Sequence, residues 1–180
     1  MKIPEPGGLA REAYEHLVAE FREVTRAVGP SGRCCEKVRD GVPECCYQII
    51  DGAELTFTER ELQLLPPGPV LSEHLMRQGE LGEYVLDREF MPAAYLEEVL
   101  HTGWLARTLE CASHPTRPLL IDGATPRVWG VAVVDCCNAR VSDYGAQKER
   151  LIRMWQTAVD LCGVKMYYGR WGIRDDWKVL

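Results

Sequence analysis

The chain has 180 residues, of which 46% are hydrophobic, so a single domain can bury a sufficient core without the help of disulfide bonds. Its 21 basic and 27 acidic residues give a net charge of −6 with no basic block, which argues against a nucleic-acid partner. The first residues lack the charged and apolar regions of a secretory signal, and no apolar stretch approaches the roughly 18 residues of a membrane span. We therefore expect a cytoplasmic protein that binds neither nucleic acid nor membranes.

The eight cysteines are the most unusual feature of the composition, and six of them form adjacent pairs. These pairs are Cys34-Cys35, Cys45-Cys46 and Cys136-Cys137. In a reducing compartment we expect such cysteines to be thiols, metal ligands or redox groups, although an even number would also suit a secreted disulfide framework.

The first two cysteine pairs follow a predicted helix. Apolar residues recur every three to four positions over residues 9–28, which predicts an amphipathic helix that ends at Gly29-Pro30. The first pair then falls in a loop just past the helix end. The second pair follows a turn signal at residues 40–43 and precedes a short apolar run that breaks at Asp51-Gly52, as a hairpin would.

A capping box is predicted at Thr58-Glu-Arg-Glu61, in which each of the two outer side chains reaches the other residue's backbone amide. A short helix should then run through Leu64. In this interpretation Glu54, Glu59 and Glu61 serve as helix caps and surface charge, because nothing in the sequence pairs them with a second carboxylate in a cleft.

The next predicted helix begins at Pro92, and its apolar face extends to Leu109. Cys111 should then lie at the C-terminal end of this helix or just beyond it. Residues 128–134 are short and β-branched, which predicts a buried strand that leads directly to the third cysteine pair.

The C-terminal third of the chain is predicted to hold a hairpin and a long helix. Asp122-Gly123 is a hairpin signal. The long helix should be capped by Ser142 or Asp143 and should end at Gly163, with Cys162 packed in the core. The whole pattern predicts an α+β, mainly helical fold, a small single domain over residues 1–180 with short strands and a cysteine-lined metal site in loops.

Zinc and iron–sulfur clusters require soft, deprotonated sulfur ligands that converge from several segments. The candidate ligands lie in turns or at the ends of predicted elements: Cys34, Cys35, Cys45, Cys46, Cys111, Cys136 and Cys137. Neighbouring residues of an extended chain point in opposite directions, so we expect one ligand from each pair. Cys111 and His114 add a Cys-x-x-His spacing. Each paired cysteine taken alone would equally suit an inert buried thiol, but three pairs in one chain favour a metal.

The order of these motifs resembles the YkgJ-like family, cysteine-cluster proteins grouped as a zinc- or iron-chelating domain. Gly32-Arg-Cys34-Cys35 is similar to the opening motif of that family. The middle motif, a cysteine followed six residues later by Arg-Pro, resembles Cys111 to Pro118, and the closing motif resembles Cys137-Asn-Ala-Arg140. These matches span about residues 31–145, which would form the cysteine-cluster region.

Two positions depart from the family pattern. The first cysteine of the opening motif is Ser31 here, and the cysteine that follows Arg-Pro is Ile121. The second cysteine pair and Cys136 have no counterpart in the pattern, so they either replace the missing ligands or belong to a different site. The resemblance also places Arg117 and Arg140 beside the metal, where guanidinium groups would offset the negative charge of several thiolates.

The C-terminal segment, residues 167–177, is unusually rich in aromatic residues and also contains Arg170 and Arg174. The simpler interpretation is a strand and a loop that pack on the core. Because tryptophan and arginine are frequent at binding hot spots, the segment is also a candidate docking surface for a protein partner.

Three hypotheses of function follow. The leading one is a metal-binding protein whose thiolates hold zinc or an iron–sulfur cluster, in metal handling or redox sensing. The second is an enzyme in which the gaps at Ser31 and Ile121 leave an open coordination position for substrate. The third is an interaction subunit with reduced core cysteines and a docking surface at its C-terminal end.

Overall fold

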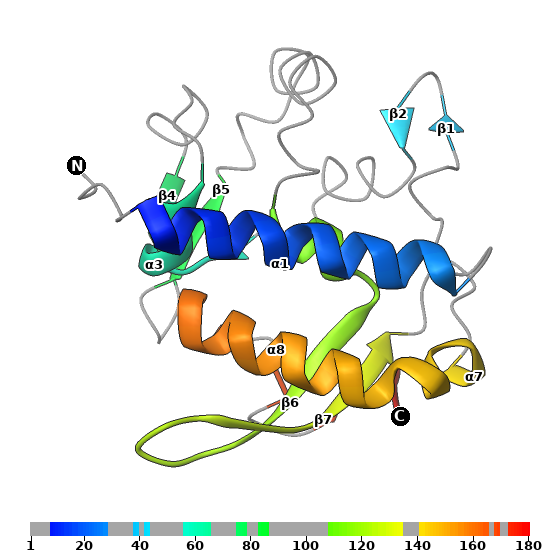
Figure 1. The fold of residues 1–180 in the computed structure, drawn as a ribbon. Coiled ribbons are helices and arrows are strands. Elements are labelled where there is room, and N and C mark those ends of the chain that lie inside the picture. The colour runs from blue at the N-terminus through cyan, green and yellow to red at the C-terminus, as the bar shows by residue number, and fades with distance from the viewer. Residues whose placement is uncertain are drawn as a thin grey trace.

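Helices and short antiparallel sheets make up the chain in the computed structural model (Figure 1). The structure describes residues 8–28, 38–39, 42–43, 56–65, 75–78, 83–86, 108–134, 141–165, 168–169 and 173–180. The α+β class that the sequence predicts is confirmed. Among the helices that the structure describes, none has the length and apolar character needed to span a bilayer.

The first helix, α1 (Gly8–Ala27), confirms the prediction for the N-terminal segment. Its buried residues recur every three to four positions, which places them on one face. They are Tyr14, Leu17, Val18, Phe21 and Val24. This face packs against the long C-terminal helix α8 (Lys148–Cys162), and the two helices lie side by side (Figure 1).

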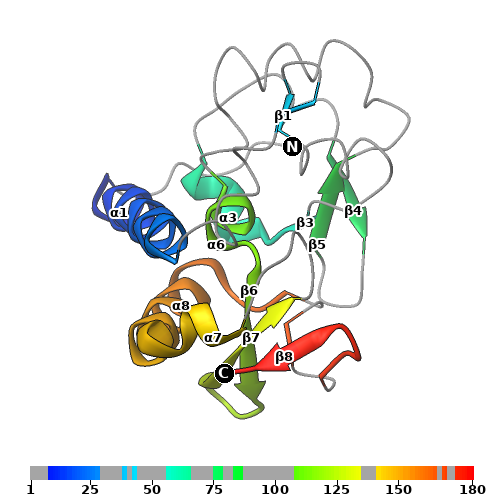
Figure 2. The same ribbon diagram turned by 90° about the vertical axis from the view of Figure 1, so that its right-hand side faces the viewer.

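An antiparallel sheet with the strand order β6-β7-β8 supports α8 from the other side. Its strands are β6 (Thr116–Ile121), β7 (Arg127–Val134) and β8 (Trp177–Val179). The strand predicted at residues 128–134 is therefore confirmed, and Asp122-Gly123 lies in the hairpin connection that joins it to β6. Figure 2 shows α1 and α8 together on one side of this sheet.

The helix α8 ends as predicted but begins later. Gly163 follows its last residue with a φ of 85°, a conformation that glycine adopts without the steric cost of a Cβ. The predicted start at Ser142 or Asp143 instead falls in a separate four-residue helix, α7 (Val141–Tyr144). A 3-10 turn, η5 (Gly145–Gln147), separates the two helices, and it begins at a glycine, a poor residue for a helix interior.

Several short elements lie between α1 and the β6-β7-β8 sheet in the sequence. A second three-stranded sheet has the order β3-β5-β4 and contains β3 (Thr56–Phe57), β4 (Leu75–Gln78) and β5 (Glu83–Leu86). The helix α3 (Glu59–Leu64) follows β3 directly, with Thr58 as its N-cap, as the capping box predicts. A two-stranded hairpin is formed by β1 (Val38–Arg39) and β2 (Val42–Pro43).

The helix α6 (Leu109–Ser113) corrects the prediction around Leu109. Leu109 was expected near the end of a helix that begins at Pro92, but it is the first residue of α6, and Thr108 precedes it in an extended conformation as the N-cap. The side chain of Thr108 competes for a backbone amide and so favours a helix start at this position. Residues 87–107 lie outside the described residues.

The main core fills the space between the helices and the inner face of the β6-β7-β8 sheet. Trp155 on α8 is fully buried at its centre, with edge-on ring contacts to Phe21 and Tyr168 at centroid distances of 5.0 Å and 5.4 Å. A smaller cluster of Leu119, Ala132 and Trp177 lies apart from this main core. The helices and sheet thus supply the rigid frame on which the polar residues described below are held.

Candidate functional site

The structure describes two of the nine residues that were predicted to form or support a metal site, namely Cys111 and Arg117. The other seven lie outside the described residues: Cys34, Cys35, Cys45, Cys46, Cys136, Cys137 and Arg140. The convergence of the cysteines on one site therefore stays a prediction. Ile121, which stands where the family pattern has a cysteine, ends β6 and is 56% exposed.

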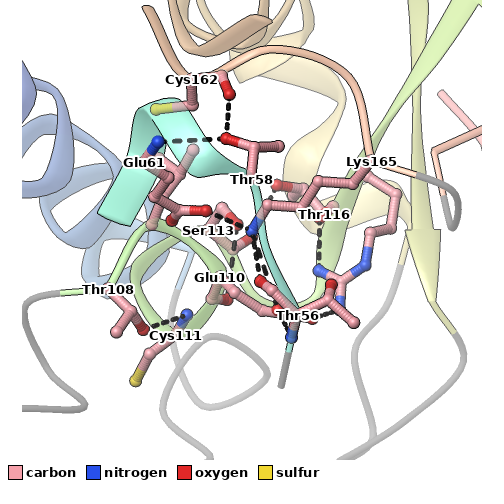
Figure 3. Close-up of polar contacts among 12 residues, drawn as sticks. Thr56, Thr58, Glu61, Thr108, Glu110, Cys111, Ser113, Thr116, Cys162 and Lys165 are labelled. Atoms are coloured by element: carbon pink, nitrogen blue, oxygen red, sulfur yellow. Dashed lines mark hydrogen bonds and ion pairs between the residues drawn. The ribbon is translucent and has the colours of Figure 1, made fainter. Parts of the chain in front are cut away.

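Cys111 lies in the first turn of α6 and is half-buried. Its backbone amide donates a hydrogen bond of 3.3 Å to Oγ1 of Thr108, which fixes the start of the helix. Figure 3 shows that the sulfur of Cys111 points away from the buried polar groups of Glu61 and Lys165. His114, the other member of the predicted Cys-x-x-His spacing, follows as the C-cap of the same helix.

The dominant polar feature of the described interior is an ion pair between Lys165 and Glu61 (Figure 3). The Lys165 Nζ and Glu61 Oε2 atoms are 2.6 Å apart, and both side chains are completely shielded from solvent. The Lys165 ammonium also donates a hydrogen bond of 2.8 Å to the carbonyl oxygen of Thr56 and lies 5.7 Å from the ring centroid of Phe57. Lys165 therefore joins the segment after α8 to both β3 and α3.

Glu110 extends this ion pair into a network of four charges. Its Oε2 accepts a hydrogen bond of 3.3 Å from the Thr56 amide and lies 3.9 Å from Lys165 Nζ. Its Oε1 lies 3.7 Å from Nη2 of Arg117, whose side chain is only 12% exposed. Two carboxylates and two cations thus balance one another, as burial requires.

Tyr14 connects the network to α1. Its hydroxyl donates to Oε1 of Glu61 at 3.3 Å and accepts a hydrogen bond of 2.9 Å from the backbone amide of Leu109. That amide is the first of α6 and has no partner within its own helix. One phenol therefore ties α1, α3 and α6 together inside the core.

The buried groups have shifted pKa values. Burial by itself would lower the pKa of Lys165, but the negative charges of Glu61 and Glu110 outweigh it and raise that pKa above 10.5. Burial raises the pKa of Glu61, and the nearby ammonium of Lys165 acts in the opposite direction. The short contact between the two groups favours the charged form of both at neutral pH. Burial, and then the charge of Glu61, raise the pKa values of Tyr14 and Cys162 well above their usual ones.

The prediction for Glu61 was wrong, and the prediction for Cys162 is confirmed. Glu61 was expected to be a capping and surface charge, but its carboxylate turns inward, and only Thr58 makes its half of the capping box, with Oγ1 accepting from the Glu61 amide at 3.0 Å. A lysine 104 residues away satisfies the carboxylate better than the Thr58 amide would. Cys162 is fully buried in the main core, as expected, and its carbonyl oxygen accepts a hydrogen bond from the Thr58 hydroxyl.

The C-terminal aromatic residues that the structure describes favour the simpler of the two interpretations. Tyr168 is 2% exposed within the main core, and Trp177 is 7% exposed in the smaller cluster. Both therefore pack on the protein's own sheet and helices. Trp171 lies outside the described residues.

Sequence reasoning missed Lys165, Glu110 and Tyr14 as members of a site. One signal was available for Lys165, which is a single charge between the apolar residues Val164 and Met166. For Glu110 and Tyr14 no local signal exists, because a glutamate is expected at the surface and a tyrosine occurs both at the surface and in the interior. Within the described part of the chain, no group of three or more histidine, cysteine and acidic side chains is placed to hold a metal ion.

Comparisons of the chain with models of known protein families, with curated proteins and with solved structures gave no match. The resemblance to the YkgJ-like family accordingly stays a hypothesis that rests on its short motifs. The described network by itself acts as an internal electrostatic cross-link, since its charges are balanced and its central pair is shielded from solvent.

Proposed function

We propose that this chain is a cysteine-cluster metal-binding protein, in which thiolates hold zinc or an iron–sulfur cluster for metal handling or redox sensing. The observation that carries the proposal is a hydrogen bond of 2.9 Å from the Val134 amide to the Pro115 carbonyl oxygen. It joins the end of β7, two residues before Cys136, to the segment that directly follows α6, which carries Cys111.

This contact limits how far apart two candidate ligands can be. An extended chain spans at most about 3.6 Å per residue, and hydrogen-bonded neighbouring strands have Cα atoms about 5 Å apart. Chain length therefore limits the Cα atoms of Cys111 and Cys136 to a separation of about 27 Å, whereas the intervening residues fully extended would span about 90 Å. Tertiary structure thus brings these two segments toward one another, as a shared site requires.

The β1–β2 hairpin gives similar support for the first two cysteine pairs. Its register places Val38 opposite Pro43 and Arg39 opposite Val42. In the sequence the first pair ends three residues before β1, and the second pair begins two residues after β2. If the same register continued for three residues, Cys35 would stand opposite Cys46, and opposed residues of an antiparallel ladder project to the same face. We therefore propose these two as the ligands from the first two pairs.

The surroundings of Arg117 also agree with the proposal. Its guanidinium donates to the carbonyl oxygen of Thr116 at 2.9 Å and pairs with Glu110, the residue before Cys111, so it is not a solvated surface charge. Because its charge is already balanced by Glu110, Arg117 would support the proposed site by holding the segment after α6 in place. The role of Arg140 is part of the same proposal and rests on the sequence motif.

The proposal is tested by metal analysis of protein purified without oxygen. We expect at least one equivalent of zinc or iron, and a visible spectrum separates the two, since iron–sulfur clusters are coloured and zinc is not. Cys111→Ser should lose the metal, whereas Cys162→Ala, which alters a buried core cysteine, should keep it. Less than one equivalent of either metal in the unaltered protein would disprove the proposal.

A further inference from the structure

The amine of Lys165 and the carboxylate of Glu61 are held in contact inside the core. Their Nζ and Oε2 atoms are 2.6 Å apart, both side chains are completely shielded from solvent, and they point toward one another (Figure 3). Glu61 belongs to α3, whereas Lys165 follows the end of α8. An amine and a carboxylic acid are the two groups that condense to an amide, so this contact is a candidate site of covalent modification.

Two neighbouring groups orient the amine and the carboxylate. The carbonyl oxygen of Thr56 accepts a hydrogen bond of 2.8 Å from Lys165 Nζ, which ties the amine to the backbone of β3. The hydroxyl of Tyr14 donates to Oε1 of Glu61 at 3.3 Å, and Lys165 contacts the other carboxylate oxygen, Oε2. A donor at Oε1 stabilises the negative charge that develops on this oxygen when a nucleophile adds to the carboxyl carbon.

Burial favours the uncharged forms that such a reaction needs. It is the largest influence on the pKa of both groups, since it raises the pKa of Glu61 and acts to lower the pKa of Lys165. Each charge is offset mainly by its partner, so the transfer of one proton along the 2.6 Å contact produces two neutral groups. The ion pair is the main form at neutral pH, and this neutral pair is its minor form.

We propose that Lys165 and Glu61 form an intramolecular isopeptide bond. A proton passes from the Lys165 ammonium to Oε2 of Glu61, and the freed electron pair of Nζ adds to the carboxyl carbon, Cδ. The Cδ–Oε2 bond then breaks, and Oε2 leaves as water with the transferred proton and a second proton from Nζ. An ammonium and a carboxylate thus become one amide and one water molecule, with no oxidant or other co-reactant.

The fold supports this step because it holds the reacting groups together in a dry core. Groups fixed in near-reactive geometry behave as if each were present at about 10⁵–10⁸ M, and the exclusion of water disfavours hydrolysis of the product. The charge balance of the network is also preserved. The bond removes one cation and one anion, and it leaves Glu110 beside Arg117 at 3.7 Å. Chains that have not reacted keep the ion pair.

The experiment is mass spectrometry of the full-length protein after treatment with a reductant. The intact mass of reacted chains should be lower by the mass of one water molecule. Trypsin should release residues 61–77 joined to residues 154–170, because an acylated Lys165 is not cleaved, and fragmentation should place the link between Glu61 and Lys165. The joined peptide decides the test, since Asp-Gly steps can also lose water. Its amount should rise during storage of the folded protein but not of protein in urea.

Lys165→Arg keeps a cation in the core but replaces the amine by a guanidinium that stays protonated, so the joined peptide should be lost. The matched control is Lys178→Arg, the same change at an exposed position of β8, which should form the joined peptide as the unaltered protein does. The proposal is overturned if the unaltered protein yields no joined peptide, if the peptide forms equally in urea, or if the link joins Lys165 to Glu110. The unaltered protein decides the result even if Lys165→Arg does not fold, and the metal content of the protein does not enter the test.

Discussion

Replacing Lys165 by methionine tests how the buried ion pair contributes to stability. The change keeps a long unbranched side chain but removes the ammonium, which contacts Glu61 at 2.6 Å and donates to the Thr56 carbonyl at 2.8 Å. Glu61 is completely buried and would then keep its carboxylate in the core without a cation at contact distance.

The loss of stability in Lys165→Met can be worked out from the attraction between the two charges and the cost of removing each charge from water. At 2.6 Å and an effective dielectric constant of about 20, two unit charges attract by about 6 kcal/mol. The transfer of each ion out of water costs several kcal/mol, so the pair as a whole contributes little net stability. Lys165→Met removes the attraction and leaves the cost of the carboxylate, and we expect a loss of about 3–5 kcal/mol in the free energy of unfolding. For a domain of this size the melting temperature should fall by about 6–20 °C.

The assay is urea unfolding at neutral pH for Lys165→Met, Glu61→Gln and the double variant, with Lys178→Met on an exposed strand position as control. The double variant should be more stable than Lys165→Met alone, because it no longer buries an uncompensated carboxylate while glutamine can still accept from Tyr14. Lys178→Met should change the free energy of unfolding by less than about 0.5 kcal/mol. The reasoning is refuted if Lys165→Met loses no more than the control, or if the two single changes simply add.

Three further predictions follow from other contacts. The pKa of the Cys162 thiol is raised above its usual 9.0 in the folded state, so the folded protein holds this proton more tightly than the unfolded chain does. The stability that this proton contributes is complete below about pH 9 and is lost as the pH rises. Cys162→Ala should therefore reduce the decline of the free energy of unfolding by about 1.4 kcal/mol per pH unit, measured by urea unfolding between pH 8 and about 10.5. Gly169→Ala should destabilise by about 1–3 kcal/mol in thermal unfolding, because its Cβ would lie 2.5 Å from Cδ2 of the buried Leu119; a melting temperature equal to that of the unaltered protein would contradict this. The double variant Cys35→Ser, Cys46→Ser should lose its metal by elemental analysis, while the double variant Cys34→Ser, Cys45→Ser should retain it. The reverse result would show that the register of the β1–β2 hairpin does not continue to these residues.

Several elements could be predicted from the sequence because their signals are local. The apolar spacing along residues 9–28 requires a helix with one buried face, which α1 confirms. The β-branched run at residues 128–134 is confirmed as β7, and Gly163 ends α8 in the left-handed region as expected. In each case neighbouring residues supply the hydrogen bonds or the steric restriction that decides the structure.

The incorrect predictions arose where two local structures were compatible with the same residues. Thr108 is a good N-cap residue, which favours a new helix at Leu109, but the apolar spacing of the residues before it is also compatible with one continuous helix. The structure has the new helix, α6, with Thr108 as its N-cap. Gly145 interrupts what was expected to be one helix from Ser142 to Gly163. Propensity differences of about 1 kcal/mol or less separate such alternatives, and tertiary packing is large enough to override them.

The sequence by itself determined the α+β class, the helices α1 and α3, the end of α8, the strand β7, and the paired thiols on which the metal proposal rests. Only the tertiary structure decided that Glu61 and Lys165, 104 residues apart, form a buried ion pair, that Glu110 is shared between Lys165 and Arg117, and that the end of β7 meets the segment after α6. The physical reason is that periodicity reports which side of an element is apolar, whereas a charge becomes stable in a core only when an opposite charge arrives from elsewhere in the chain. That meeting depends on the packing of all the elements together, and no local segment encodes it.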